Sequence, residues 1–262
     1  MNGVVFLGGG RITSALVAGL RLAQYQIPIV VYDRHISKLR ALRRRYGVHI
    51  EPDLRRAIAQ ATLLIIAVRP ESVGELLGQI GRIRRPLTAV SLAAGIPLSR
   101  LRRQLGPPVN WARAMPSPVC RSGRGLTALT FERRFPGRAR RRVVSLFAAV
   151  GSVLEIAERK FDAFTVTYSS SHGYHALAAL AGAAEKLGLD RRSALMAAAH
   201  ALADGVLAWR EGHLSLNRLL HEAATPGGVA ATVMATMDVA GYGRTIEKGL
   251  RAGMKRAREN RR

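Results

Sequence analysis

Short apolar runs, each closed by glycine, proline or a charged residue, dominate the first part of the chain. The run at 63–68 is continuous rather than alternating, which is typical of a strand buried on both faces of a parallel sheet. Segments with apolar residues at helical spacing separate the runs, so the pattern predicts a doubly wound α/β domain. Strands are expected at 4–7, 27–32, 48–50, 63–68, 87–92, 125–130 and 153–156, with one more ending at 115, and helices at 37–46, 52–60, 71–83, 98–105 and 140–150.

The pattern of apolar and polar residues changes near residue 158, where the strand signals stop. From Phe161 onward the chain is alanine-rich and helical, with breaks at Gly188, Gly212, 225–228 and Gly241. Several short helices around one small core suggest that a second copy of the chain completes the packing. We therefore expect a nucleotide-binding domain at 1–158 and a helical substrate-binding and dimerisation domain at 159–262.

A glycine turn joins the first predicted strand to the first predicted helix and reads G-x-G-x-x-T. Gly8 permits a tight turn, and Gly10 lets a pyrophosphate approach the backbone N–H groups that open the helix. Thr13 takes the place of the third glycine, where a small residue suffices for helix packing. Such turns often only connect a strand to a helix, but Asp33 follows the second apolar run, where an acidic residue would meet a ribose hydroxyl. The context favours a dinucleotide site.

The choice between the two nicotinamide cofactors stays open in the sequence. Asp33 would bind a ribose 2′-hydroxyl and repel a 2′-phosphate, which favours NADH. Arg34, His35 and Lys38 would attract that phosphate, which favours NADPH. The prediction leans slightly to NADPH.

Composition narrows the class of protein. The 262 residues are 48% hydrophobic, enough for a proper core, and carry a net charge of +24 that is concentrated in the first half. This charge would attract any anion, but its arginines are scattered without interleaved aromatic residues, so we expect only weak, non-specific nucleic-acid binding. Cys120 is the sole cysteine, and neither a leader nor an apolar run of about 18 residues is evident. A cytoplasmic protein outside the membrane is expected.

Thr225-Pro226-Gly227-Gly228 is the sharpest motif of the second half. Thr225 is a good N-cap and Pro226 suits the first helical position, so a helix is expected to begin here. The N–H groups of Gly227 and Gly228 would form an anion cradle for a carboxylate. An ordinary capped helix is an equal alternative.

Taken in order, six motifs resemble those of the pyrroline-5-carboxylate reductase family. They are Gly8-x-Gly10, Ala67-Val68-Arg69-Pro70, Ser91-Leu92-Ala93-Ala94-Gly95, Arg113-Ala114-Met115-Pro116, the stretch 168–174 and Thr225-Pro226-Gly227-Gly228. The resemblance covers nearly the whole chain. It implies an oxidoreductase of proline biosynthesis, which reduces the cyclic imine 1-pyrroline-5-carboxylate to L-proline with NAD(P)H. It also implies a Rossmann-type domain followed by an all-helical domain that interlocks in a homodimer.

The resemblance also implies roles for individual residues. The pyrophosphate would contact Gly8, Gly10, Arg11, Ile12 and Thr13. The ribose and nicotinamide side would be lined by Ala67, Val68, Arg69 and Pro70, with Ala93, Ala94, Met115, Pro116 and Ser117 flanking the ring. The substrate carboxylate would contact Thr225, Gly227 and Gly228. Further predicted substrate residues are Ser117, Ser170, Ser171 and Thr232.

Some positions depart from the family pattern. Arg69 stands where lysine is common, Ser117 where asparagine is common, and His172 replaces a proline. Ala230 lacks the hydroxyl that contacts the substrate carboxylate, a loss of roughly 1.5–3 kcal/mol unless another side chain compensates. Thr232, His172 and Ser169–Ser171 are the residues that could do so. A relative acting on another cyclic imine, or a degenerate member that binds nucleotide or nucleic acid, are the alternatives.

Two histidines are candidate acids. His172 and His175 would share a helix face, and we expect His172, together with Thr225, to be catalytic, while His175 suits an interface. A substrate that arrives already protonated would not require a strong general acid. Neither cysteine nor carboxylate completes a ligand set around the histidines, so the sequence predicts no metal site.

Overall fold

The computed structural model describes residues 3–260 and divides the chain into two compact units. The first unit comprises Met1–Tyr168 and Gly253–Arg262, and the second comprises Ser169–Ala252. The contact division thus comes ten residues after the domain boundary expected from the sequence and returns the C-terminal segment to the first unit. The boundary at 158/159 itself stays a prediction.

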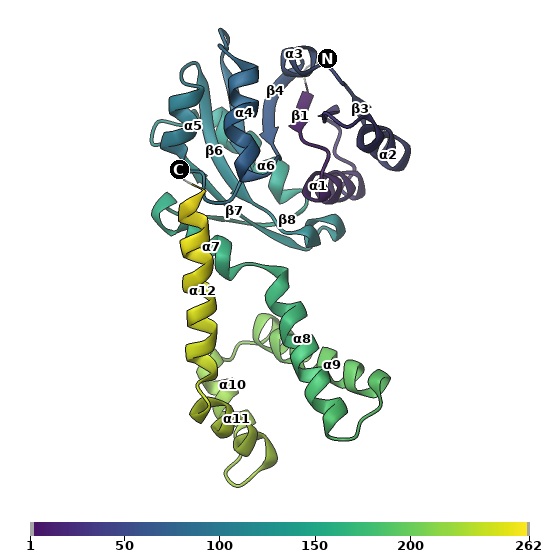
Figure 1. The fold of residues 1–262 in the computed structure, drawn as a ribbon, viewed down its shortest axis with the longest axis vertical. Helices are drawn as coiled ribbons and strands as arrows, with labels where there is room; N and C mark the ends of the chain where they lie inside the picture. Colours follow the sequence, from purple (N-terminus) through teal and green to yellow (C-terminus); the bar gives the residue numbers. More distant parts are fainter. Residues whose placement is uncertain (1–2, 261–262) are drawn as a thin grey trace. The chain divides into compact units, whose positions relative to one another are not determined.

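The first unit is built on an eight-stranded sheet in the order β3-β2-β1-β4-β5-β6-β7-β8 (Figure 1). The strands are β1 (Gly3–Leu7), β2 (Ile29–Tyr32), β3 (His49–Ile50), β4 (Ala61–Ile66), β5 (Leu87–Ser91), β6 (Val109–Met115), β7 (Gly125–Phe131) and β8 (Gly151–Glu155). Every neighbouring pair is parallel except β6 and β7, which run antiparallel. The chain between these two strands is too short for the crossover helix that a parallel pair needs. The predicted doubly wound sheet is confirmed, with this one reversal.

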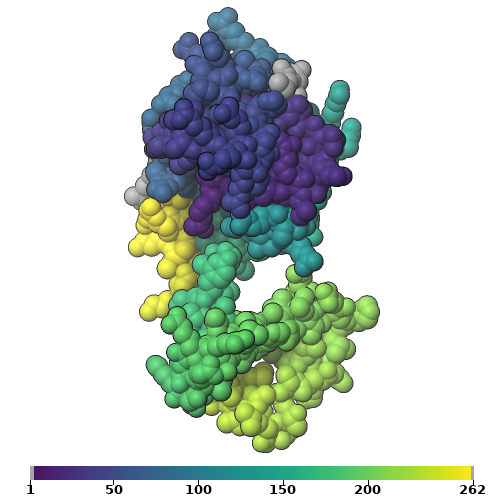
Figure 2. Space-filling view, turned by 90° about the vertical axis from the view of Figure 1, so that its right-hand side faces the viewer, coloured from purple at the N-terminus to yellow at the C-terminus, as the bar shows by residue number. Residues whose placement is uncertain are grey.

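Helices cover both faces of the sheet. They are α1 (Arg11–Leu22), α2 (Ile36–Tyr46), α3 (Leu54–Ala59), α4 (Pro70–Ile80), α5 (Leu98–Gln104), α6 (Gly137–Ala148) and α7 (Glu158–Thr167), with the 3-10 helix η1 at Pro118–Ser122. Alternate residues of β1 enter opposite cores: Val4 and Phe6 pack with α1 and α6, whereas Val5 and Leu7 pack with α3, α4 and α5. This two-sided burial explains the continuous apolar runs in the sequence. Figure 2 shows the segments from β1 to α3 together on one face of this unit.

The second unit contains helices and no strand among the described residues. They are α8 (Ser170–Lys186), α9 (Arg191–Glu211), α10 (Leu216–Ala223), α11 (Val229–Val239) and the first part of α12 (Tyr242–Glu259). The predicted breaks at Gly188, Gly212 and Gly241 are confirmed, since each lies between two helices. Large apolar side chains such as Trp209, which is 51% exposed, remain accessible on these helices. Within residues 3–260, none of the helices combines the length and the apolar character that a membrane crossing requires.

Within the first unit, the C-terminal segment packs on the loop after β5. The Asn260 side chain donates to the Ala94 carbonyl (3.3 Å), and Arg100 donates to the Asn260 carbonyl (2.8 Å). Gly95 has a φ of 78°, and a Cβ on it would lie 2.2 Å from the Ala257 carbonyl oxygen. Only glycine fits this close approach.

Candidate functional site

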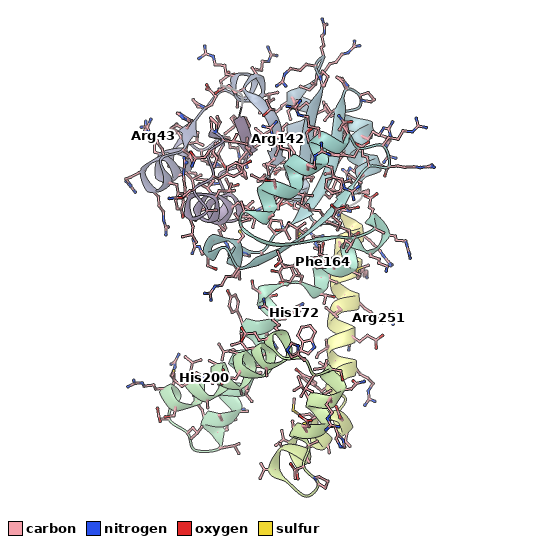
Figure 3. The ribbon with its side chains drawn as sticks, turned by 180° about the vertical axis from the view of Figure 1, so that it is seen from behind. Arg43, Arg142, Phe164, His172, His200 and Arg251 are labelled. Atoms are coloured by element: carbon pink, nitrogen blue, oxygen red, sulfur yellow. The ribbon has the colours of Figure 1, made fainter. Side chains whose placement is uncertain are left out.

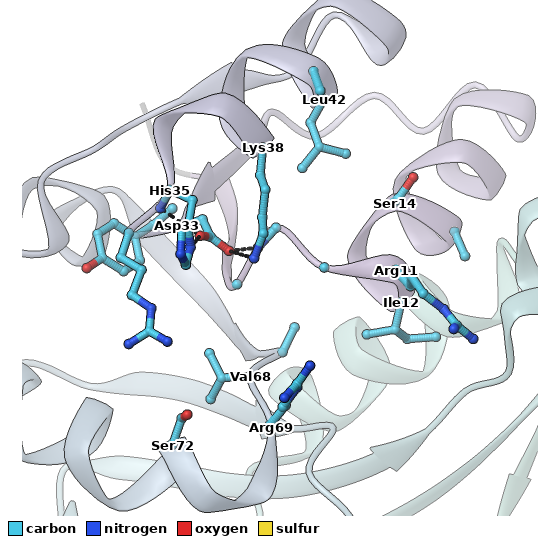
Figure 4. A pocket seen from close by; sticks show the side chains of 18 of the residues that line it. Arg11, Ile12, Ser14, Asp33, His35, Lys38, Leu42, Val68, Arg69 and Ser72 are labelled. Carbon is cyan, nitrogen blue, oxygen red and sulfur yellow. Dashed lines mark hydrogen bonds and ion pairs between the residues drawn. The ribbon is translucent and has the colours of Figure 1, made fainter.

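An open groove of about 1450 Å³ lies over the carboxyl ends of β1, β2 and β4 (Figure 4). Doubly wound sheets bind ligands at this end, where loops from adjacent strands meet. The predicted cofactor residues that line the groove are Gly8, Gly10, Arg11, Ile12, Asp33, Arg34, Ala67, Val68 and Arg69. The structure thus brings together residues that lie as far apart as 61 positions in the sequence.

The glycine turn forms the floor of the groove. Gly8 has a φ of 114°, its N–H donates to the Tyr32 carbonyl (2.7 Å), and its carbonyl accepts a hydrogen bond from the buried Thr13 hydroxyl (2.5 Å). Gly10 is the N-cap of α1, and a Cβ on it would meet no described heavy atom within 4 Å. The first N–H groups of α1 therefore open onto free space, which fits a pyrophosphate.

Asp33 ties two loops together instead of projecting freely into the groove. One carboxylate oxygen accepts a hydrogen bond from the Gly9 N–H (2.8 Å). The other oxygen accepts one from the backbone N–H of His35 (2.8 Å) and lies 2.9 Å from Nδ1 of the His35 ring. The Lys38 ammonium lies 3.7 Å from the first oxygen (Figure 4). Burial alone would raise the pKa of Asp33, but these hydrogen bonds and the Lys38 charge outweigh it and hold the pKa below its ordinary value.

The lowered pKa predicts a pH-dependent contribution of Asp33 to stability. The contribution is present above the unfolded carboxyl pKa of about 3.9 and is lost as the pH falls through the lower folded value. Asp33→Asn should therefore lower the free energy of unfolding at neutral pH, and the difference from the wild type should shrink below about pH 4. Urea denaturation at several pH values measures this difference. Glu71→Gln, an exposed change in the same groove, is the control, and an Asp33→Asn difference that does not vary with pH would contradict the assignment.

The groove is rich in positive charge. Its basic lining residues are Arg11, Arg34, Lys38, Arg45, Arg69 and Arg121, against the acidic Asp33, Glu71 and Glu75. Arg69, the N-cap of α4, lines the groove with a side chain that is 87% exposed (Figure 4). The arrangement suits a ligand with several phosphates. Other arginines, such as Arg43 on α2, extend outward from the unit (Figure 3).

Five predicted cofactor residues do not line the groove. Thr13 is buried beneath it, Pro70 opens α4, Ala93 is buried, Ala94 meets Asn260, and Met115 ends β6 half-buried. Thr13 instead stabilises the glycine turn through its bond to Gly8. For these five residues a direct contact with the cofactor stays a prediction.

Two polar clusters lie near the ends of β6 and β7. The Ser117 hydroxyl is hydrogen-bonded to Tyr168 (3.1 Å), a residue that sequence reasoning did not assign to a site. Arg113 is buried against Asp162 (2.9 Å) and lies over the Phe161 ring (4.4 Å to its centroid). The sequence singled out Ser117, the Arg113 motif and the stretch 168–174. It did not reveal which residues pair, because each pair joins residues about 50 positions apart.

The candidate residues of the second unit lie at helix starts. Ser169 is the N-cap of α8, where its oxygen accepts from the Ser171 N–H (3.4 Å) and meets the Ser171 hydroxyl (2.7 Å). Ser170 begins this helix, and His172 donates its N–H to the Ser169 carbonyl (3.1 Å). Thr232 lies in α11 and donates its hydroxyl to the Gly228 carbonyl (3.2 Å).

The predicted helix start at Thr225 was wrong. α11 begins at Val229 with Gly228 as N-cap, and the four residues before it form a turn in which the Gly228 N–H donates to the Thr225 carbonyl (2.9 Å). Pro226 and Gly227, which has a φ of 75°, occupy the positions that a type II turn requires of these residue types. Turn chemistry therefore overrides the capping preference of threonine. The open N–H groups at this helix start are those of Val229–Ala231.

Among residues 3–260, no three His, Cys, Asp or Glu side chains form a group that could hold a metal ion. Cys120 is buried, and burial raises the pKa of its thiol to about 12. A neutral, enclosed thiol of this kind is inert.

Comparison with known proteins gives two family matches and several relatives over nearly the whole chain. Residues 3–95 match the family described as NADP oxidoreductase coenzyme F420-dependent, and residues 158–260 match pyrroline-5-carboxylate reductase dimerisation. The pyrroline-5-carboxylate reductase of Thermus thermophilus is 31% identical over 98% of this chain and 97% of its own length. That of Synechocystis is 28% identical over 97% and 96%. The fold matches a Plasmodium falciparum pyrroline carboxylate reductase with NADP bound (TM-score 0.87, 18% identity, 99% and 98% covered).

Proposed function

Because the chain belongs to the pyrroline-5-carboxylate reductase family, we propose that it reduces 1-pyrroline-5-carboxylate to L-proline with NADPH. The observation that carries the proposal is the phosphate-compatible groove over β1, β2 and β4, in a chain that matches such reductases over nearly its whole length. A single cysteine, buried and reduced, fits a reducing compartment, and the cytoplasm is the proposed place of the reaction.

The bound nicotinamide supplies the hydride that the carbon–nitrogen double bond accepts. The chain's own residues bind and orient the cofactor and the imine. The N–H groups that open α1 hold the pyrophosphate, Arg11 and Arg69 neutralise its charge, and Val68 covers the apolar side of the groove. A fixed cofactor and a fixed imine remove the entropy cost of bringing the two together.

The substrate and catalytic residues predicted from the sequence stay proposals. The proposed substrate residues are Ser117, Ser170, Ser171, Thr225, Gly227, Gly228 and Thr232, and the proposed catalytic residues are His172 and Thr225. The N–H groups of Val229–Ala231 offer the carboxylate a helix start even though Ala230 has no hydroxyl. The exposed apolar side chains of the second unit would pack against a second copy in a homodimer.

NADPH is the proposed cofactor because Asp33 is already engaged by Gly9, His35 and Lys38. Arg34 lines the groove beside it and would pair with the 2′-phosphate. Arg34→Ala should therefore raise KM for NADPH about 10–100-fold, since a hydrogen bond to a charged group contributes about 1.5–3 kcal/mol, and leave KM for NADH nearly unchanged. Steady-state kinetics with both cofactors measures this.

Arg43→Ala is the matched control, because Arg43 lies on α2, outside the groove, and carries the same charge. An equal effect of the two substitutions would mean that only the overall field matters, and would contradict a 2′-phosphate contact.

The experiment that tests the function follows NADPH absorbance with the purified protein and 1-pyrroline-5-carboxylate, and identifies L-proline in the product. Consumption of NADPH with proline formed supports the proposal. NADPH binding without turnover of this substrate would overturn it. Turnover of another cyclic imine would then identify the second candidate, which the missing hydroxyl at Ala230 favours.

A further inference from the structure

A chain of hydrogen bonds with a fixed direction ends at Ser117. The Leu126 N–H donates to the Tyr168 oxygen (2.9 Å), and the Tyr168 hydroxyl donates to Ser117 Oγ (3.1 Å). The Val119 N–H donates to the same Ser117 oxygen (3.3 Å). All four residues belong to the first unit.

The direction of these bonds leaves the Ser117 hydroxyl free to act as a hydrogen-bond donor only. A serine hydroxyl has two acceptor lone pairs and one proton. The Val119 amide can only donate, so it fills one lone pair, and Tyr168 fills the other. The Ser117 proton remains, which makes Ser117 a donor to whatever lies against it.

Ser117 adjoins the groove without being one of its lining residues. It directly follows β6, at the carboxyl end of a strand parallel to β5, and the next residue, Pro118, lines the groove together with Arg121. The residue is 6% exposed, so its hydroxyl is shielded from water. A donor in such surroundings is stronger than the same donor in water.

We propose that Ser117 protonates the imine nitrogen of the substrate and that Tyr168 is the residue that positions and reprotonates it. This inference rests on the proposed function. The substrate offers two acceptors, its carboxylate and its neutral imine nitrogen. The nitrogen is the one that gains a proton when the carbon–nitrogen double bond is reduced, so it is the acceptor that a proton donor serves.

Each proton and electron pair of the reduction has a source and a destination. The carbon of the C=N bond gains a hydride from the cofactor, and the π-electron pair of that bond moves to nitrogen. The nitrogen takes the Ser117 proton, the Ser117 oxygen takes the Tyr168 proton, and water restores Tyr168. The Leu126 N–H stabilises the phenolate oxygen in the meantime. A neutral imine is thereby reduced without prior protonation in solution.

Three variants test the relay across the pH range. Tyr168→Phe removes the hydroxyl and keeps the ring that packs on Phe164, Ser117→Ala removes the donor, and Ser117→Thr restores it. At acidic pH the substrate is already protonated, so the first two variants should stay within about threefold of wild-type kcat/KM. At alkaline pH the neutral imine needs the donor, so they should fall by about 100-fold, in line with the usual effect of a positioned acid, and Ser117→Thr should not.

Controls separate this role from a structural one. Tyr242→Phe alters an exposed tyrosine of α12, outside the proposed site, and should leave the pH profile unchanged. Thermal unfolding and NADPH titration of each variant report folding and cofactor binding independently of turnover. A loss by the same factor at every pH, or a wild-type profile in Tyr168→Phe, would overturn the relay while the proposed function stands. A wild type that binds NADPH and reduces no cyclic imine would overturn both.

Discussion

Replacing Gly8 by alanine is expected to abolish NADPH binding and to lower the free energy of unfolding by about 2–5 kcal/mol. Gly8 has a φ of 114°, which an L-residue rarely adopts. An added Cβ would lie 2.5 Å from the Ala67 carbonyl oxygen and 2.9 Å from its carbon, and neither backbone atom can yield without parting β1 from β4. Urea denaturation and a fluorescence titration with NADPH measure the two effects.

Gly10→Ala separates cofactor approach from folding in the same turn. Gly10 has a φ of −79°, and its added Cβ would meet no described heavy atom within 4 Å, so the unfolding free energy should fall by at most about 1 kcal/mol. The methyl group would nevertheless occupy the space through which a pyrophosphate reaches the first N–H groups of α1. NADPH affinity should therefore drop in a protein that remains folded. Unchanged affinity in Gly10→Ala would place the pyrophosphate elsewhere.

Replacing Arg113 by alanine is expected to cost about 3–5 kcal/mol of stability, the usual loss when one partner of a buried ion pair is removed. Its guanidinium is 2% exposed and donates to Asp162, which is 4% exposed, at 2.9 Å, with the Glu158 carboxylate 3.5 Å away. Without Arg113 the Asp162 charge loses its buried counter-ion, and the space over the Phe161 ring empties. Chemical denaturation measures the loss.

Arg102→Ala provides the matched comparison in the same unit. Arg102 is 62% exposed and lies 3.7 Å from Glu132, so its loss should cost no more than about 1 kcal/mol. Equal losses for the two variants would contradict a buried, structural role for Arg113. Arg113→Met with Asp162→Leu should recover most of the stability, because the apolar pair needs no counter-charge.

The strands were predictable because a strand that is buried on both faces has a continuous apolar run in its sequence, as at 63–68. The antiparallel pairing of β6 with β7 was not, because it follows from the length of a connection rather than from any residue type. The start of α11 was misplaced because Thr225 satisfies a capping rule and Pro226-Gly227 a turn rule, and the turn prevailed.

The groove was predictable from the glycine turn and its spacing to Asp33, but the state of Asp33 was not. Its engagement by Gly9 and His35 depends on how two loops meet in space. The bond between Tyr168 and Ser117 has the same origin, since it joins residues 51 positions apart that carry no shared pattern. Local rules locate turns and strands, while hydrogen bonds between distant loops require the fold.

The packing of Ala257 and Asn260 on the loop at Ala94 and Gly95 has a consequence for synthesis of the protein. The ribosome makes these residues about 90 positions after Tyr168, roughly 4–18 s later at ordinary elongation rates. During that interval the nucleotide-binding unit exposes the backbone around Gly95 while the helices of the second unit emerge. A nascent chain stalled before Gly253 should accordingly be more sensitive to protease at this loop than the released protein.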